Sequence, residues 1–182
     1  SKGPARQMNF ESASFRALTE TPAAEFFPQV GPDGRTVVYA SEERGNWDIY
    51  VRDSEASATE RPRNLTEESK DSDSEPALSP DGMRVAFRSE RDGGGIYVME
   101  LSGGKARKLT SLGHNPSWSP DGAEVVCATE GIMRPEDRYT AASQLWAVRV
   151  DNGARRLVSN GDAVQPSWSP NGERIAFWAS RN

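Results

Sequence analysis

This 182-residue chain has many acidic residues, but their spacing singles out no catalytic carboxylate pair. His114 is the single histidine, whereas a serine peptidase needs a serine, a histidine and an acid in one site. The chain has no Gly-x-Ser-x-Gly elbow, no His-Glu-x-x-His or Cys-x-x-Cys pair, and no Gly-x-x-x-x-Gly-Lys phosphate loop. We therefore expect no enzymatic activity and no cofactor. For His114 itself, a structural role before Pro116 is favoured over pH sensing at a channel mouth.

The densest acidic stretch runs from Glu67 to Glu75 and contains the spacing Asp71-x-Asp73-x-Glu75. Carboxylates at alternate positions can offer oxygen ligands to Ca²⁺. The glycine that a tight calcium loop of the EF-hand type needs is missing from this stretch. The sequence therefore favours a solvated loop between two structural repeats, and we predict no metal site.

The elements that would position these residues are set by a repeated turn. Each copy places Pro, then Asp or Asn, then Gly where a type I turn and the left-handed residue after it need them. The prolines of this turn stand at 32, 80, 120 and 170, so the repeat lengths are 48, 40 and 50 residues. The four copies are Phe27-Pro-Gln-Val-Gly-Pro-Asp-Gly34, Glu75-Pro-Ala-Leu-Ser-Pro-Asp-Gly82, Asn115-Pro-Ser-Trp-Ser-Pro-Asp-Gly122 and Gln165-Pro-Ser-Trp-Ser-Pro-Asn-Gly172.

A strand is predicted on each side of every turn, and two more strands follow. Apolar residues stand three and five positions after each glycine, on one face of the outgoing strand: Val37 and Tyr39, Val85 and Phe87, Val125 and Cys127, and Ile175 and Phe177. Cys127, the only cysteine, thus takes an aromatic position, and we expect a buried thiol there. Third strands are predicted at 48–51, 95–98 and 144–147, and fourth strands at 64–66, 108–110 and 156–158.

Four short strands per repeat at this repeat length predict an all-β chain, a β-propeller of about four four-stranded antiparallel blades. After a leader at 1–6, residues 27–66, 75–110 and 115–158 are predicted to form three blades, and residues 165–182 the first two strands of a fourth. Residues 7–19 are predicted to supply its last two strands, with Phe15 to Thr19 matching the fourth strand and Gln7 to Phe10 more weakly the third. One blade would then be split between the N- and C-termini.

Three assemblies satisfy this strand count. The chain can close as a four-bladed ring, two chains can form an eight-bladed ring as a homodimer that completes the split blades, or the chain can be part of a larger propeller. An unpaired strand at the end would expose an apolar edge that natural sheets avoid. We therefore expect the ends to be paired.

Composition excludes several classes of partner. The net charge is −5 and the pI about 5.1, which argues against nucleic acid, because nucleic-acid surfaces carry a basic stripe. No apolar run approaches the ~18 residues that a spanning helix needs, so no membrane insertion is predicted.

Residues 76–110 carry one complete copy of a recognisable string: Pro76, Ser79-Pro-Asp-Gly82, Val85-Ala-Phe87, Ile96-Tyr-Val-Met99 and Leu109-Thr110. This string resembles the TolB-like, WD-repeat-like propeller repeats of bacteria, and most of all the sensor-type propellers of bacterial Ser/Thr kinases and regulators. The resemblance covers nearly the whole chain from residue 15, with Gly31 and Asn171 departing from the motif. It implies a periplasmic or other extracytoplasmic location.

Binding residues are expected on one face of the ring, where the loops before the first strand meet those between the second and third strands. The candidates near the axis are Asp73, Glu75, His114 and Asn115, and those farther out are Trp47, Arg91, Arg134, Arg138 and Tyr139. The sequence thus predicts a non-catalytic scaffold that recognises a protein or peptide. The alternative is the propeller portion of a prolyl-oligopeptidase-like hydrolase whose catalytic domain is absent from these residues.

Overall fold

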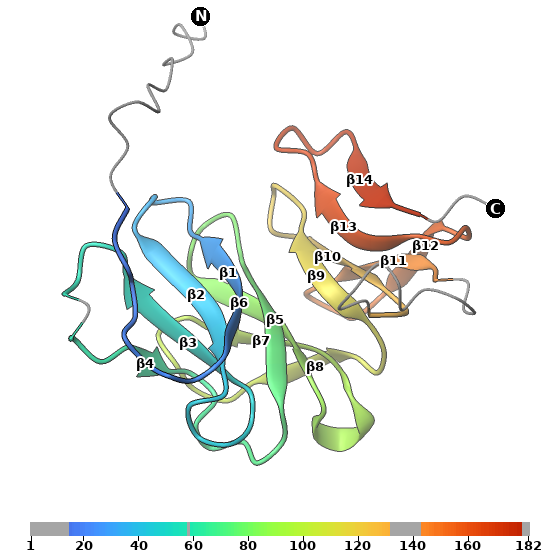
Figure 1. The fold of residues 1–182 in the computed structure, drawn as a ribbon. Helices are drawn as coiled ribbons and strands as arrows, with labels where there is room; N and C mark the ends of the chain where they lie inside the picture. The colour runs from blue at the N-terminus through green and yellow to red at the C-terminus, as the bar shows by residue number, and fades with distance from the viewer. Residues whose placement is uncertain (1–14, 58, 132–142, 180–182) are drawn as a thin grey trace, which may run out of the picture.

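The computed structural model describes residues 15–57, 59–131 and 143–179. Apart from one short 3₁₀ turn, every regular element in this part of the chain is a β-strand (Figure 1). The strands are β1 (Glu25–Val30), β2 (Thr36–Ser41), β3 (Asp48–Asp53), β4 (Arg63–Asn64), β5 (Asp73–Leu78), β6 (Arg84–Ser89), β7 (Gly95–Glu100), β8 (Arg107–Thr110), β9 (His114–Trp118), β10 (Glu124–Ala128), β11 (Leu145–Arg149), β12 (Arg155–Ser159), β13 (Val164–Trp168) and β14 (Ile175–Trp178), with the turn η2 (Arg91–Gly93) between β6 and β7.

The predicted turns form the hairpins that join each first strand to its second. In the second repeat, the Asp81 carboxylate accepts hydrogen bonds from the Ser79 hydroxyl at 2.5 Å and from the Met83 amide at 2.9 Å. Gly82 adopts a φ of 70°, a left-handed conformation that favours glycine. In the fourth repeat, the Asn171 side-chain oxygen accepts from Ser169 in the same way, at 2.7 Å. The turn needs a side-chain oxygen at this position, and aspartate and asparagine both supply it.

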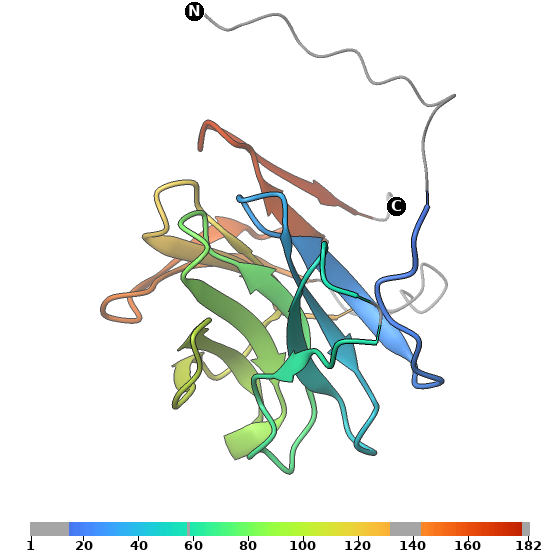
Figure 2. The ribbon, with the colours of Figure 1, turned by 90° about the vertical axis from the view of Figure 1, so that its left-hand side faces the viewer.

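The strands assemble into four antiparallel sheets in which each strand pairs with its neighbours in sequence. The first sheet holds β1 to β4, the second β5 to β8, the third β9 to β12, and the fourth β13 and β14. Successive sheets pack face to face, and their first strands contact one another in turn along an inner edge (Figure 2). This arrangement is that of propeller blades around an axis, which confirms the predicted fold class.

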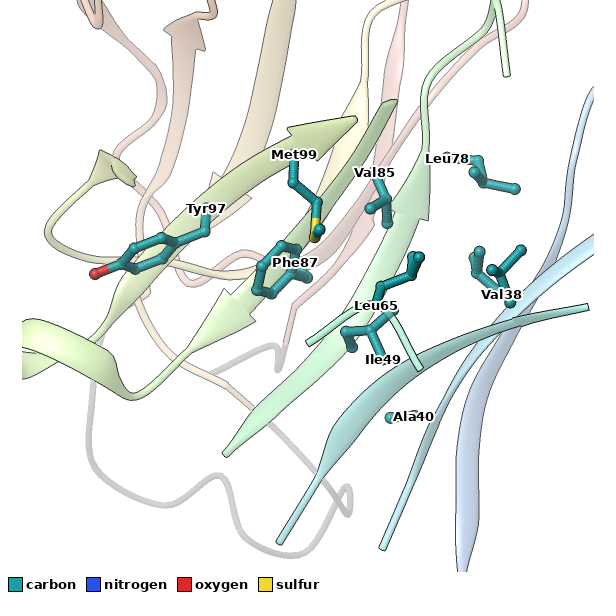
Figure 3. Close-up of a cluster of buried hydrophobic side chains, with 10 residues drawn as sticks. Val38, Ala40, Ile49, Leu65, Leu78, Val85, Phe87, Tyr97 and Met99 are labelled. Carbon is teal, nitrogen blue, oxygen red and sulfur yellow. The ribbon is translucent and has the colours of Figure 1, made fainter. Parts of the chain in front are cut away.

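The hydrophobic core lies between the sheets. Figure 3 shows the cluster between the first and second sheets, where Val38, Ile49 and Leu65 meet Val85 and Phe87. Similar clusters fill the next two gaps. Since the second and third sheets are covered on both faces, their second strands, β6 and β10, are apolar at consecutive positions instead of alternating ones.

Cys127 lies in the cluster between the second and third sheets and is fully buried, as predicted. Burial, and to a smaller extent the negative charge of Glu75, raises the pKa of the Cys127 thiol to about 12. The thiol therefore serves as a small packed apolar group.

The segment before β1 packs on the outer face of the first sheet. Leu18 contacts the cluster of Val37, Tyr39 and Tyr50, a position equivalent to that of Leu65 on the second sheet. Residues 15–24 form no strand, and residues 7–14 of the proposed split blade lie outside the described residues. The assignment of 7–19 to a split blade therefore stays a prediction.

In the fourth strand of the third sheet, the residue that packs into the core lies one position later than the comparison of the repeats predicts. The alignment matched Leu157 with Leu109, but the strand pairing places Val158 there, since Ser159 lies opposite Leu145 as Thr110 lies opposite Ile96. Val158 packs into the core while Leu157 is 44% exposed. The second sheet has the same register shift, between Ile96 and Tyr97, so Leu109 and Val158 are equivalent residues and the prediction was one position too early in the third sheet.

The described residues form no helix that is long and apolar enough to cross a membrane.

Candidate functional site

The inner edge of the sheets carries an irregularity that repeats in every first strand. The residue before the first proline of each repeat has a positive φ, between 48° and 56°. In all four sheets the pairing with the second strand shifts at this point. Proline cannot donate to the ladder, so a bulge at this position loses no hydrogen bond. The four residues are Phe27, Glu75, Asn115 and Gln165.

These bulges converge on an open hollow of about 280 Å³. Its walls come from the first strands of all four sheets, so no single repeat makes it. Positive φ at residues other than glycine costs about 1–3 kcal/mol each and is concentrated at binding and catalytic sites. The inner hollow, as we call it, is lined by Phe27, Pro28, Gln29, Glu75, Pro76, Ala77, Asn115, Pro116, Gln165 and Pro166.

Glu75 organises one side of the inner hollow. Its carboxylate accepts a hydrogen bond from the Asn115 main-chain amide at 2.5 Å and lies 3.5 Å from Nδ1 of His114. Both side chains are largely covered, with 27% of His114 and 11% of Glu75 exposed. The structure thus brings together three of the sequence-predicted residues, and it pairs His114 with a carboxylate of the neighbouring sheet.

Gln29 and Gln165 supply the other polar groups of the inner hollow. The side-chain oxygen of Gln29 accepts from the Leu78 amide, and that of Gln165 accepts from the Trp178 indole at 2.7 Å. Within the described residues, neither amide NH₂ group donates a hydrogen bond. The Asn115 side-chain oxygen is likewise buried without a partner in this part of the chain. The hollow therefore presents both donors and acceptors, which suits a ligand with both.

Two other predicted residues, Asp73 and Arg91, form an ion pair within the second sheet. The Asp73 carboxylate is fully buried and accepts from the Arg91 guanidinium at 2.5 Å. Burial raises the pKa of Asp73. Arg91 also lies over the rings of Phe87 and Tyr97. In this geometry the ion pair joins the start of β5 to the η2 turn of the same sheet, and Asp73 is not accessible to a partner.

Trp47 also makes contacts within the fold. Its ring lies 5.4 Å from that of Phe26, and its main-chain oxygen accepts the Asp73 amide at 2.7 Å. Arg134, Arg138 and Tyr139 lie outside the described residues, so their part in a site stays a prediction.

Of the ten residues that line the inner hollow, sequence reasoning named only Glu75 and Asn115, and it missed Phe27, Gln29 and Gln165 among the rest. Phe27 and Gln165 carry the same signal as Glu75 and Asn115, since each precedes the first proline of its repeat. Among residues 15–57, 59–131 and 143–179, no three His, Cys, Asp or Glu side chains are grouped to hold a metal ion.

Antiparallel sheets of up to four sequential strands, packed around a shared inner hollow, define a β-propeller. Residues 7–182 match the TolB beta propeller domain family, PD40, and the chain belongs to that family.

The individual proteins that the chain resembles include a peptidase and TolB proteins. The chain is 29% identical to the uncharacterized peptidase YuxL of Bacillus subtilis over 84% of its own length, and 32% identical to the TolB homolog of Chlorobium luteolum over 58%. It spans only 29% and 23% of those two proteins. The crystal structure of TolB from Acinetobacter baumannii has a TM-score of 0.68 at 23% identity, over 88% of this chain and 39% of that one, which shows a shared fold.

Proposed function

We propose that this propeller is a non-catalytic scaffold that recognises an extended segment of a protein or peptide at the inner hollow. The observation that carries the proposal is the convergence of four repeat-equivalent bulges, with Phe27, Glu75, Asn115 and Gln165, on one hollow. Backbone strain of this kind is concentrated at binding and catalytic sites, which supports the proposal.

The chemistry of the inner hollow supports a peptide as the ligand. A peptide main chain carries one donor and one acceptor per residue. The NH₂ groups of Gln29 and Gln165 can bond its carbonyls, while Glu75 gives the hollow a negative charge beside the apolar ring of Phe27. Prolines and an aromatic ring offer the apolar surface on which side chains of the ligand would pack.

A selected peptide tests this proposal. Phage-displayed heptapeptides are selected on the whole chain, and the affinity of the best peptide is measured by fluorescence anisotropy. We expect the double variant Gln29→Ala/Gln165→Ala to bind it at least about tenfold more weakly, since two hydrogen bonds are lost. Gln144→Ala is the matched control, because Gln144 bonds Asn160 and Trp146 away from the hollow. Equal affinity for all three proteins, or no selected peptide, would refute the proposal.

The second candidate function is the propeller portion of a hydrolase. The similarity to a B. subtilis peptidase over 84% of the chain favours it. It predicts that the gene encodes a further domain with a serine, a histidine and an acid in one site. Reading the coding sequence on both sides decides between the two candidates, since a scaffold needs no such domain.

Assembly as two chains that complete each other's sheets is a separate proposal. The contacts of Leu18 are compatible with it and with a single-chain ring, because residues before β1 cover the first sheet where the fourth strand of a preceding sheet would lie. Light scattering tests it: a mass near twice 19.9 kDa is expected, and a strict monomer would contradict it.

A further inference from the structure

A groove of about 580 Å³ lies between the second and third sheets, away from the inner hollow. Four basic and two acidic side chains line it, although the chain as a whole has a net charge of −5. The basic residues are Arg84, Lys105, Arg107 and Arg149, and the acidic ones are Glu100 and Asp151. We call this site the rim groove.

Arg107 is held in the rim groove by a main-chain carbonyl and not by a carboxylate. Its guanidinium donates to the Val150 oxygen at 2.6 Å, which joins the second sheet to the third. Within the described residues it forms no ion pair. A carbonyl oxygen carries only a partial charge, so this bond fixes the guanidinium in place without neutralising it.

Arg84 reaches the third sheet in the same manner from the start of β6. Its guanidinium donates to the Gly122 oxygen at 3.3 Å and lies over the Trp118 ring at 4.8 Å. One carboxylate, that of Asp81, is 3.6 Å away, but it is 49% exposed and accepts hydrogen bonds within its own turn. Such an exposed pair neutralises the arginine only weakly.

The two carbonyl acceptors lie beside each other. Gly122 is followed by Ala123, whose main-chain oxygen accepts the Val150 amide at 3.0 Å. Arg84 and Arg107 therefore donate to neighbouring points of the third sheet from two strands of the second. Two positive charges held in this way repel each other, and an anion bound between them would remove the repulsion.

The other charges of the rim groove leave this excess in place. Arg149 and Asp151 bind each other through two hydrogen bonds, at 2.7 and 3.1 Å, and so cancel. Glu100 lies opposite Arg84 in the strand pairing but forms no ion pair in the described part of the chain. Lys105 adds a third positive charge, likewise without a hydrogen bond or ion pair among the described residues.

Of the three interfaces between the described sheets, only this one combines two such arginines. The strand pairing places Thr36 of the first sheet and Glu124 of the third at the position of Arg84. Arg63 repeats the bond of Arg107 at the interface of the first and second sheets, but Thr36 supplies no second cation there. The repeat itself therefore does not require the pair of arginines, which favours a role in binding.

We propose that the rim groove binds a doubly charged oxyanion, the phosphate group of a small ligand, between the guanidiniums of Arg84 and Arg107. Planar guanidinium groups suit the tetrahedral oxygens of phosphate, because each can donate two hydrogen bonds in parallel. A volume of about 580 Å³ is in the range of small-molecule sites and leaves room for the rest of the ligand. The proposal does not rest on the function of the inner hollow.

Inorganic pyrophosphate is the probe, added to the whole chain at low ionic strength and followed by isothermal titration calorimetry. We expect saturable binding, and an at least about tenfold lower affinity for Arg84→Gln and for Arg107→Gln, since each removes one charged donor. Arg63→Gln is the matched control, because Arg63 makes the same bond to a main-chain oxygen outside the rim groove. Urea midpoints establish that each variant is folded. Succinate, which carries the same type of charge on two carboxylates, should bind more weakly than pyrophosphate.

Three results would overturn the proposal. The first is the absence of saturable binding up to about 10 mM pyrophosphate, where even a weak site fills. The second is an equal loss of affinity in Arg63→Gln and in the two groove variants, which would mean that only the net charge matters. The third is tighter binding of succinate than of pyrophosphate, which would show that the site is built for carboxylates.

Discussion

The guanidinium of Arg63, on the last strand of the first sheet, donates a hydrogen bond to the main-chain oxygen of Leu101 at the end of the third strand of the second sheet. The bond joins residues 38 positions apart in sequence and fixes the outer rims of two sheets to each other. Arg107 repeats the bond to Val150 of the third sheet. The hydrophobic clusters hold the sheets face to face. The two arginines fix the position of one sheet along the next.

Arg63→Ala should therefore lower the free energy of unfolding by about 1 kcal/mol, the net contribution of one hydrogen bond. Urea denaturation followed by tryptophan fluorescence measures the effect. Arg61→Ala is the control, since Arg61 is exposed two residues away. Equal urea midpoints for the two variants would show that the bond contributes nothing.

Leu18→Ala should destabilise the first sheet. Leu18 is half-buried against Val37, Tyr39 and Tyr50, and truncating a partly buried leucine should cost about 1–2 kcal/mol. Phe15→Ala, three residues earlier, changes a ring that is 96% exposed and should stay within about 0.5 kcal/mol of the wild type. Thermal unfolding by circular dichroism compares the two. If the Phe15 variant were the less stable one, the proposed packing of this segment would be wrong.

Stability should fall in acid because of the turn aspartates. The hydrogen bond from the Thr36 side chain lowers the pKa of Asp33 to about 2, and hydrogen bonds from Ser79 and Ser119 lower the pKa values of Asp81 and Asp121. A pKa that is lower in the folded state adds stability above the unfolded value of 3.8, and this contribution is lost as the pH falls toward about 2.

Urea midpoints at pH 5 and pH 3 measure this loss. The triple variant Asp33→Asn/Asp81→Asn/Asp121→Asn should lose less stability than the wild type over that interval, because asparagine keeps the acceptor without titrating, as Asn171 does in the fourth repeat. Glu60→Gln removes an exposed carboxylate outside the turns and serves as the control. An acid sensitivity that is the same in all three proteins would exclude the turns as its source.

Cys127 should resist thiol reagents in the folded protein. Its side chain is fully buried, and burial raises the pKa of the thiol to about 12, so little thiolate exists at pH 8. Labelling with a chromogenic disulfide should be slow in buffer and complete within the mixing time in concentrated urea. Rapid labelling of the native protein would mean that the gap between the second and third sheets opens readily.

The sequence predicted the parts of this structure that are fixed by local chemistry. Proline, aspartate and glycine set the turns, and apolar residues three and five positions after each turn glycine mark the second strands, so the fold class followed from one repeat. The inward position of Val158 was missed because Leu157 was matched with Leu109 by residue type, whereas the strand pairing aligns Val158 with Leu109. Gln29 and Gln165 were missed since the hollow exists only where four sheets meet. Asp73 was predicted as a binding residue, but its ion pair with Arg91 lies inside the second sheet.

Each of the four sheets is covered on one face by an apolar side chain that precedes that sheet in sequence. Leu18 covers the first sheet, Leu65 the second, Leu109 the third and Val158 the fourth. Since a chain leaves the ribosome from its N-terminus, each new sheet finds its covering residue already made and attached to a formed neighbour. Synthesis and folding can therefore advance together, one sheet at a time, with no need to wait for distant parts of the chain.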